Sequence, residues 1–202
     1  MFTGIIQSIG TITEISRKKI MQVSIRPNLK KRFSIGESVS IDGVCSTIVA
    51  IKQGNLVFEY MSHTVQVTTV QYWEKGGRVN TETSLKVGDE LSGHFVLGHV
   101  DTHTRITKLE KVNGQTALTI QVPKNLVPYV SPRGSITIDG VSLTIGSIKK
   151  ENATVFLTPF TYAHTTFQYK KRGDAVNLEV DMLAKLVHNT ICQLKTKKKS
   201  KK

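Results

Sequence analysis

Small polar side chains that could bind a ligand or act as nucleophiles recur in two similar stretches of the chain. The stretches are "GESVSIDGVCSTI", residues 36–48, and "RGSITIDGVSLTI", residues 133–145. In both, an Asp-Gly pair separates two segments of alternating apolar residues. This pattern predicts a two-residue hairpin turn, because both turn positions need a positive φ. The cross-strand pairs predicted for the first copy are Ile41 with Val44, Ser40 with Cys45, Val39 with Ser46 and Ser38 with Thr47.

Alternation along the strands gives each predicted hairpin one apolar face and one face of hydroxyl or thiol groups. A face that meets water usually carries Lys and Glu as well, and neither polar face has a charged residue. We therefore favour a shallow site for a flat polar ligand over a merely solvated face. The apolar face of the first copy holds Val39, Ile41, Val44 and Ser46. The polar faces are Ser38, Ser40, Cys45 and Thr47 in the first copy, and Ser135, Thr137, Ser142 and Thr144 in the second.

A constant offset of 97 residues joins the two copies and extends well beyond the hairpins. It relates Thr64 to Thr161 and "VNTE" at 79 to "VNLE" at 176, whereas Gly4 and Gly98 differ by 94. Such regular spacing indicates a duplicated module. We predict an N-terminal lobe over 1–90, a C-terminal lobe over 91–184, and the end of a helix with a basic tail over 185–202.

Both lobes have the pattern of small β-barrels or sandwiches, and one helix is expected at the end. Short segments rich in Val, Ile, Thr and Phe alternate with Gly, Asn and Asp. In "DMLAKLVHNTICQL", residues 181–194, the apolar positions recur every three or four residues and form one stripe. The stripe could pack on its own chain or form a helix bundle between subunits.

The three histidines of "GHFVLGHVDTH" raise the question of a metal site. On one strand His94 and His99 would point to opposite faces, and no Cys or acidic cluster completes a ligand set. We therefore expect no metal, although Gly98 beside His99 could let a ligand approach the backbone closely. No phosphate loop or dinucleotide fingerprint is present, so a nucleotide-dependent reaction has no support.

Composition and charge narrow the class of protein further. Among the 202 residues, 28 Lys and Arg face 15 Asp and Glu, and six of the lysines lie in the last eight residues. No aromatic residues are interleaved with this tail, so we do not expect it to bind nucleic acid. Neither an export signal nor a long apolar segment is found, and two cysteines in unlike contexts do not suggest a disulfide. We expect a cytoplasmic protein with no membrane association.

Several motifs together resemble the alpha-chain type of the riboflavin synthase family, across nearly the whole chain. They are "MFTGII", "SIDGVCST", "GHFVLGHVD", "GSITIDGVSLTIG" and two "VNxE" segments. The resemblance implies an all-β fold of two similar six-stranded antiparallel Greek-key β-barrels from an internal duplication, plus a C-terminal α-helix and a homotrimer. Family members convert two molecules of 6,7-dimethyl-8-ribityllumazine into riboflavin and 5-amino-6-(D-ribitylamino)uracil. No cofactor is implied, because donor and acceptor are the same compound.

The resemblance also implies a set of site residues, with Cys45, His99 and Ser142 as the catalytic groups. The working site would lie between the N-lobe of one subunit and the C-lobe of a neighbour. Expected contacts of the first lobe are Gly4, Ile5, Ile6, Ser38, Cys45, Ser46, Thr47, Glu59, Tyr60, Met61, Ser62, His63 and Thr64. Expected contacts of the second are Gly98, His99, Val100, Arg133, Asp139, Ser142, Leu143, Thr144, Phe156, Leu157, Thr158, Pro159, Phe160 and Thr161.

This chain departs from the family pattern at four of these positions, and two other classes of protein remain as alternatives. His63 and Phe160 stand where the family has glutamates, Arg133 where Lys is common, and Ser46 where Leu is usual. One alternative is a lumazine or flavin carrier that binds the ligand without turnover. The other is a basic β-barrel that binds nucleic acid, which would explain the charge but not the duplicated polar faces.

Overall fold

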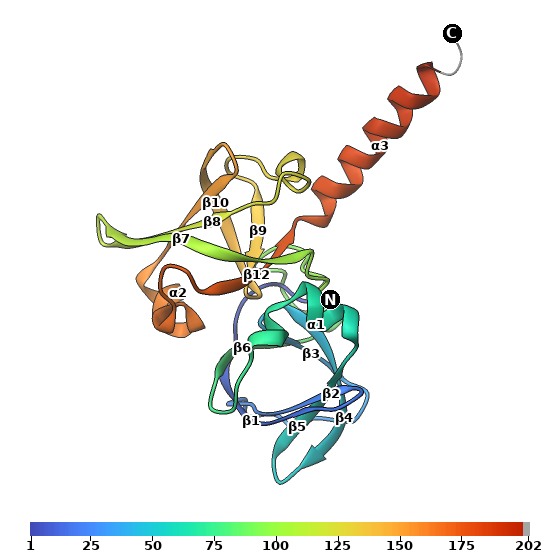
Figure 1. The fold of residues 1–202 in the computed structure, drawn as a ribbon, viewed down its shortest axis with the longest axis vertical. Coiled ribbons are helices and arrows are strands. Elements are labelled where there is room, and N and C mark those ends of the chain that lie inside the picture. Colours follow the sequence, from blue (N-terminus) through green and yellow to red (C-terminus); the bar gives the residue numbers. More distant parts are fainter. Residues whose placement is uncertain (200–202) are drawn as a thin grey trace.

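Each lobe of the protein is a closed six-stranded antiparallel barrel, and one long helix follows the second barrel (Figure 1). The computed structural model describes the backbone of residues 1–199 and the side chains of 1–195; residues 200–202 of the basic tail lie outside the described residues. The predicted fold class is confirmed. The first barrel runs in the order β1 (Ser8–Arg17), β2 (Met21–Arg26), β5 (Asn55–Tyr60), β4 (Val44–Lys52), β3 (Ser38–Ile41) and β6 (Arg78–Thr83).

The second barrel repeats this arrangement with strands at equivalent positions. Each barrel also has one short α-helix after its fifth strand, followed by a 3-10 turn. The order is β10 (Val141–Lys149), β11 (Asn152–Leu157), β8 (Gln115–Gln121), β7 (Thr102–Val112), β12 (Ala175–Val180) and β9 (Ser135–Ile138). The helical pieces are α1 (Ser62–Val67), η1 (Thr69–Tyr72), η2 (Val127–Tyr129), α2 (Pro159–His164), η3 (Thr166–Tyr169) and α3 (Met182–Lys199).

The two Asp-Gly hairpins have the predicted register. Asp42 and Gly43 adopt φ values of 46° and 82°, and Asp139 and Gly140 adopt 45° and 80°. Ser40 therefore pairs with Cys45, as expected from the sequence. The second hairpin pairs Thr137 with Ser142 in the same way.

Each barrel encloses its own apolar core. Ile25 and Phe58 are fully buried in the first core, and Leu118 and Phe167 in the second. Since period-two alternation directs these side chains inward, the polar faces of the hairpins are left on the outside of the barrels.

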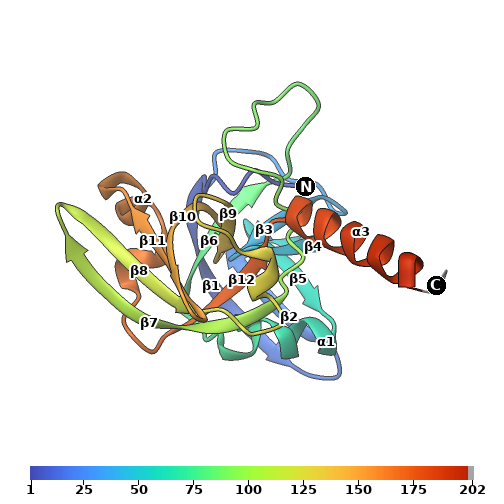
Figure 2. The same ribbon diagram turned by 90° about the horizontal axis from the view of Figure 1, so that it is seen from above.

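Two extended segments, which we call the arms, cross between the barrels. The N-terminal arm is residues 1–6, and the second arm is residues 93–100, at the end of the segment that loops out between β6 and β7 (Figure 2). Phe2 and Val96 pair backbone to backbone, with N···O distances of 2.7 and 3.1 Å. Both side chains are fully buried, so the arms are part of the folded body.

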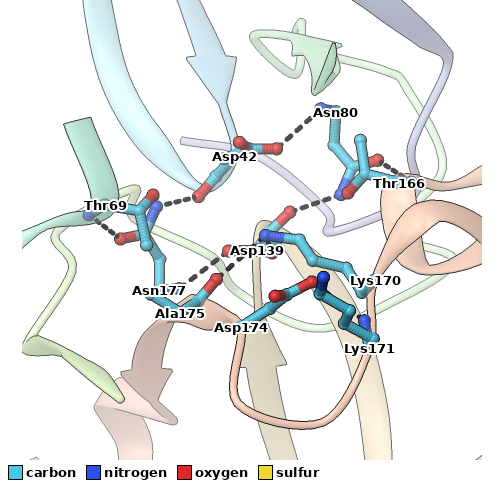
Figure 3. Close-up of polar contacts among 10 residues, drawn as sticks. All are labelled: Asp42, Thr69, Asn80, Asp139, Thr166, Lys170, Lys171, Asp174, Ala175 and Asn177. Atoms are coloured by element: carbon cyan, nitrogen blue, oxygen red, sulfur yellow. Dashed lines mark hydrogen bonds and ion pairs between the residues drawn. The ribbon is translucent and has the colours of Figure 1, made fainter. Parts of the chain in front are cut away.

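The barrels meet at the tips of their Asp-Gly hairpins, where residues of the two lobes are joined by hydrogen bonds (Figure 3). A Cβ atom on Gly43 would lie 2.7 Å from the backbone nitrogen of Gly140, so only glycine allows this approach. The side-chain amide of Asn80 donates to the Asp139 carbonyl at 2.9 Å. Asn177 donates to the Asp42 carbonyl at 2.8 Å, which completes a reciprocal pair across the interface.

Two buried carboxylates and one lysine lie in the same interface. Asp42 and Asp139 each accept a backbone N–H, from Asn80 and Asn177 respectively, at 2.7 Å. The ammonium of Lys170 lies 3.0 Å from the Asp139 carboxylate (Figure 3). Burial, together with the neighbouring charge of Asp139, raises the pKa of Asp42 well above its ordinary value. Burial also raises the pKa of Asp139, against the opposing effect of Lys170.

The terminal helix α3 projects away from both barrels (Figure 1). It is tied to the body near its start, where Lys185 contacts the Asp101 carboxylate at 2.7 Å and the ring of His188 meets Tyr129 edge-on. Among the described residues nothing covers its apolar stripe, and the exposed side chains are Leu183, Leu186, Val187, Ile191 and Leu194. Within the described part of the chain, none of the helices has the length and apolar character needed to cross a membrane.

Candidate ligand sites on the two hairpins

The arms bring a glycine against each polar hairpin face. The carbonyl of Gly4 accepts the backbone N–H of Ser142 at 2.8 Å, and the carbonyl of Gly98 accepts that of Cys45 at 2.9 Å. Both glycines have a positive φ, 78° and 74°. A Cβ atom would lie 2.6 Å from the Ser142 side chain at Gly4, and 2.8 Å from that of Cys45 at Gly98.

This pairing corrects the grouping expected from the family resemblance. The resemblance implies that Gly4, Ile5 and Ile6 belong to the site of the first lobe, and Gly98, His99 and Val100 to that of the second. In the structure Ile6 packs against the second core and Val100 against the first. The exchange arises because the arms cross at the Phe2–Val96 pair, so each arm reaches the barrel that is farther along the chain from it.

A buried glutamate anchors each arm to the barrel that is its neighbour in sequence. Glu82 accepts the backbone N–H groups of Thr3 and Gly4 at 2.7 and 3.0 Å. Glu179 accepts those of Leu97 and Gly98 at 2.8 and 3.1 Å. These are the glutamates of the two "VNxE" segments. Burial raises the pKa of Glu179 to about 6, against the lowering effect of the two N–H groups.

We call the first site the Cys45 site, a cavity of about 270 Å³ on the first barrel. The side chains that line this cavity include a thiol, two imidazoles and a threonine hydroxyl, all available to a ligand at one place. Within residues 1–199, no three His, Cys, Asp or Glu side chains are grouped so that they could hold a metal ion. The cavity is lined by Val44, Cys45, His63, Thr64, Val67, Thr68, Gly98, His99 and Val100.

The second site, the Ser142 site, is made of Gly4, Ile5, His94, Thr137 and Ser142. Ser142 Oγ lies 2.7 Å from Nδ1 of His94. Nε2 of the same ring lies 3.1 Å from Thr137 Oγ1. The expected catalytic residues are thus divided, with Cys45 and His99 in one site and Ser142 in the other.

His94 is a site residue that the sequence reasoning considered only as a metal ligand. Its side chain is partly buried between two hydroxyls of the hairpin. One signal in the sequence was informative: the dipeptide Gly-His occurs twice within seven residues, at Gly93-His94 and at Gly98-His99. Each glycine passes close to a hairpin, and each histidine follows it into a site.

The short helices α1 and α2 hold several of the expected contact residues, and they differ between the lobes. The Thr158 hydroxyl caps α2 by accepting the Thr161 N–H at 3.1 Å. In α2 the rings of Phe160 and His164 stack with centroids 3.9 Å apart, and Phe160 is 70% exposed. The equivalent position in α1 is His63, which lines the Cys45 site. The departures at these two positions therefore exchange a carboxylate for an imidazole in one lobe and for an aromatic ring in the other.

Five of the expected contact residues have side chains that a ligand on the outer face cannot reach. Ser46 points into the first barrel, where its hydroxyl bonds to Tyr60 at 2.9 Å. Leu143 and Leu157 belong to the second core. Asp139 is fully buried between the lobes. For Ser46, Tyr60, Asp139, Leu143 and Leu157 the resemblance thus named positions whose side chains have structural roles.

The other expected residues have accessible side chains, and their contact with a ligand stays a prediction. Glu59 is exposed and accepts a hydrogen bond from Gln22 at 2.8 Å. Arg133 is exposed, with a φ of 67°. The exposed or half-buried remainder are Ser38, Thr47, Met61, Ser62, Thr144, Phe156, Thr158, Pro159 and Thr161.

Two closed barrels with one polar hairpin site each define a duplicated binding protein, and the comparison with known families shows its class. The lumazine binding domain family matches residues 3–84 and 97–181. The chain therefore belongs to this family and contains two copies of the domain.

Full-length relatives and solved structures agree with this family. Riboflavin synthase of Chlamydia trachomatis serovar D is 36% identical over 203 positions, covering 100% of both chains. Riboflavin synthase of Bacillus subtilis is 33% identical over 190 positions, covering 93% of this chain and 88% of the other. LumP in complex with 6,7-dimethyl-8-(1'-D-ribityl)lumazine covers 89% of this chain and 99% of its own, with a TM-score of 0.79 and 21% identity. LumP in complex with riboflavin has a TM-score of 0.80 and 22% identity.

Proposed function

We propose that this chain is a riboflavin synthase, which transfers a four-carbon unit between two molecules of 6,7-dimethyl-8-ribityllumazine. The products are riboflavin and 5-amino-6-(D-ribitylamino)uracil. The observation that carries the proposal is the pair of related but unlike sites, one with a thiol and two imidazoles and the other with a serine bonded to an imidazole. Two binding sites suit a reaction that consumes two copies of one compound. Sequence identity of 33–36% to riboflavin synthases, over nearly the full length of the chain, supports the same function.

The chemistry requires removal of a proton from the C7 methyl group of one lumazine and addition of a nucleophile to the other. Hydroxyl, thiol and imidazole groups can perform such proton transfers when they lie within hydrogen-bonding distance of the substrate. Here Ser142 belongs to one site, and Cys45 and His99 belong to the other. Much of the rate acceleration would come from holding two flat rings face to face.

A homotrimer is part of the proposal, because a single chain carries its two sets of catalytic groups at separate sites. The exposed apolar stripe of α3 supports association, since a projecting helix of this kind is stabilised by packing against copies of itself. In such an assembly the Cys45 site of one subunit would face the Ser142 site of another. A cytoplasmic location is also part of the proposal, because the two cysteines, Cys45 and Cys192, lie in unlike contexts in the sequence and do not suggest a disulfide framework.

The test is to incubate the pure protein with 6,7-dimethyl-8-ribityllumazine alone. We expect riboflavin and the diaminouracil in equal amounts, followed by absorbance and chromatography. A protein that changes the fluorescence of the lumazine but forms no riboflavin over hours would be a carrier. Binding of nucleic acid without any effect on lumazine would contradict both functions.

A further inference from the structure

One imidazole in the Ser142 site bridges a cross-strand pair of hydroxyls. Thr137 and Ser142 are directly opposite each other on β9 and β10. His94 bonds to Ser142 Oγ through Nδ1 at 2.7 Å and to Thr137 Oγ1 through Nε2 at 3.1 Å. A neutral imidazole has one donor and one acceptor nitrogen, so this arrangement uses both.

The backbone fixes the position of this ring. His94 donates its backbone N–H to the carbonyl of Thr3 at 3.1 Å. Just before it, a Cβ atom on Gly93 would lie 2.0 Å from that carbonyl oxygen and 3.1 Å from the Cβ atom of Ser142. The second arm therefore passes between Thr3 and Ser142 with no room for a side chain. The ring is positioned by the crossing of the arms and not by its own rotamer alone.

The Cys45 site has no equivalent bridge. Cys45 and Ser40 form the corresponding cross-strand pair, but among the described residues no imidazole is hydrogen-bonded to either side chain. His63 and His99 line the same cavity without bonding to the thiol. The replacement of Cys by Ser between the two copies thus coincides with the presence of a hydrogen-bonded histidine.

We propose that His94 is a positioning residue that makes Ser142 the proton-transfer group of this protein; this rests on the proposed function. In the resting site Ser142 Oγ–H donates to Nδ1, and Nε2–H donates to Thr137. When a C–H bond of the C7 methyl group breaks, its electron pair stays on the lumazine, and its proton goes to Ser142 Oγ. The original hydroxyl proton moves to His94 Nδ1, which gives an imidazolium. One proton is returned from the imidazolium through Ser142 when the uracil product forms, so no other reactant is consumed.

The surroundings of the ring suit a base. Burial lowers the pKa of His94, and the carboxylate of Asp181 at the start of α3 opposes this shift. On β9 and β10 the neighbours are the uncharged hydroxyls of Thr137 and Ser142. The N-terminal arm carries no ionisable side chain, and the Glu82 carboxylate of β6, which anchors this arm, accepts the N–H groups of Thr3 and Gly4. The ring is thus neutral near pH 7 and able to accept a proton.

The test compares His94→Gln with the wild type in turnover and in exchange of the C7 methyl protons. Gln retains an amide donor and acceptor but has no basic nitrogen. Exchange of the methyl protons for solvent deuterium, followed by NMR, reports proton removal even where no riboflavin forms. We expect exchange and kcat to fall at least tenfold, with lumazine affinity within about threefold of wild type. The fall of kcat at acidic pH that reflects protonation of His94 should also be lost.

Matched variants distinguish this role from a structural one. The double variant His94→Gln with Ser142→Ala should be no slower than Ser142→Ala alone, because both changes interrupt one relay. Thr137→Val, which removes only the Nε2 partner, should give a smaller loss. His103→Gln, outside both sites and bonded to Tyr72, should keep the wild-type pH profile. The inference about His94 would be overturned if His94→Gln showed wild-type exchange and kcat, or if the losses in the double variant were additive. The proposed function would not be affected by either result. A wild-type protein that neither exchanges the methyl protons nor forms riboflavin would overturn the proposed function as well.

Discussion

At the scale of single residues, two glycines determine how closely the arms approach the polar hairpins. Gly4 and Gly98 combine a positive φ with a backbone carbonyl that accepts an N–H from Ser142 or Cys45. A left-handed backbone conformation alone costs an ordinary residue about 1–2 kcal/mol. Contact with the hairpin adds a second cost, because the neighbouring backbone must move. Position 98 therefore affects both the stability of the arm and the shape of the Cys45 site.

Gly98→Ala should weaken lumazine binding and lower the free energy of unfolding. Gly54→Ala provides a matched control, because Gly54 has a φ of 78° and no atom within 4 Å of its would-be Cβ. We expect the control to lose about 1–2 kcal/mol from strain alone and to bind lumazine normally. Urea unfolding and fluorescence titration measure the two effects. Equal losses of stability and equal affinity in the two variants would show that the close approach to Cys45 has no consequence.

The direction of a side chain was largely predictable where it followed from the alternation of inward and outward residues along a strand. It was much less predictable where it was inferred from the family resemblance. The period-two pattern placed Ser46 with Val44 on the inner face, and the structure confirms this orientation. The list based on resemblance nevertheless included Ser46 among the ligand contacts. His94 could not be assigned from the sequence, because its role depends on Thr3 and Ser142, which are distant along the chain.

At the scale of elements, the arms are held by the carboxylates of buried glutamates. Glu179 accepts two backbone N–H groups of the second arm, yet burial raises its pKa from an ordinary 4.5 to about 6. A raised acid pKa means that the folded state holds the proton more tightly than the unfolded chain does. The free energy of unfolding is therefore highest below about pH 4.5 as far as this group is concerned, and it decreases as the pH rises to about 6.

Glu179→Gln should remove this part of the pH dependence. A shift of this size corresponds to about 2 kcal/mol between the two ends of the window. We expect the difference in free energy of unfolding between wild type and variant to change by about that amount or less from pH 4.5 to 6.5. Chemical unfolding at each pH measures this difference. Below pH 4.5 the variant should be the less stable protein, because Gln offers only one oxygen to two N–H donors. A difference that is constant with pH would contradict a raised pKa.

The stripe on α3 gives a prediction about assembly. Removal of residues after 181 should convert a trimer into monomers and lower turnover, because the stripe would be lost and the proposed working site spans two subunits. Light scattering measures the first effect and riboflavin formation the second. Removal of residues 195–202 is the control, since it keeps Leu194 and every other member of the stripe. It should leave assembly and turnover unchanged while weakening any salt-sensitive binding to polyanions. The same oligomer in all three proteins would contradict the prediction.

The elements themselves were more predictable than their spatial partners. Both hairpins, the duplication and the helix from Met182 follow from local turn chemistry and periodicity. The crossing of the arms does not, because an extended segment of only six to eight residues carries no pattern that specifies which barrel it will contact. The Phe2–Val96 pair joins residues 94 positions apart, and its register depends on the finished barrels.

At the scale of the whole molecule, the interface between the lobes has an uneven number of charges. Two buried carboxylates, Asp42 and Asp139, are neighbours of one partly buried cation, Lys170. The carboxylates outweigh the effect of burial on the lysine and raise its pKa. One positive charge offsets one carboxylate, and it lies next to Asp139. Asp42 is therefore the carboxylate that the folded interface disfavours in its ionised form.

Substitutions at Asp42 and Lys170 should change stability in opposite directions. Asp42→Asn keeps an oxygen for the Asn80 N–H and tolerates a φ of 46°. Because the pKa of Asp42 is raised, the wild type loses stability as the pH rises through that pKa, and the variant does not. At pH 8 we expect Asp42→Asn to be more stable by about 1–2 kcal/mol. Lys170→Met should be less stable by about 3–5 kcal/mol, because it leaves a buried carboxylate without a counter-charge.

The double variant shows whether these two effects share one cause. If the lobes are held against a surplus of negative charge, Asp42→Asn should recover part of the stability lost in Lys170→Met, and the double-mutant cycle should give a coupling of about 1 kcal/mol or more. Unfolding in urea at pH 5 and pH 8 provides the four free energies at each pH. Coupling should be larger at pH 8 than at pH 5, because ionisation of Asp42 increases with pH. Additive effects at both pH values, or an Asp42→Asn protein that is less stable than wild type at pH 8, would mean that the interface accommodates two ionised carboxylates without strain.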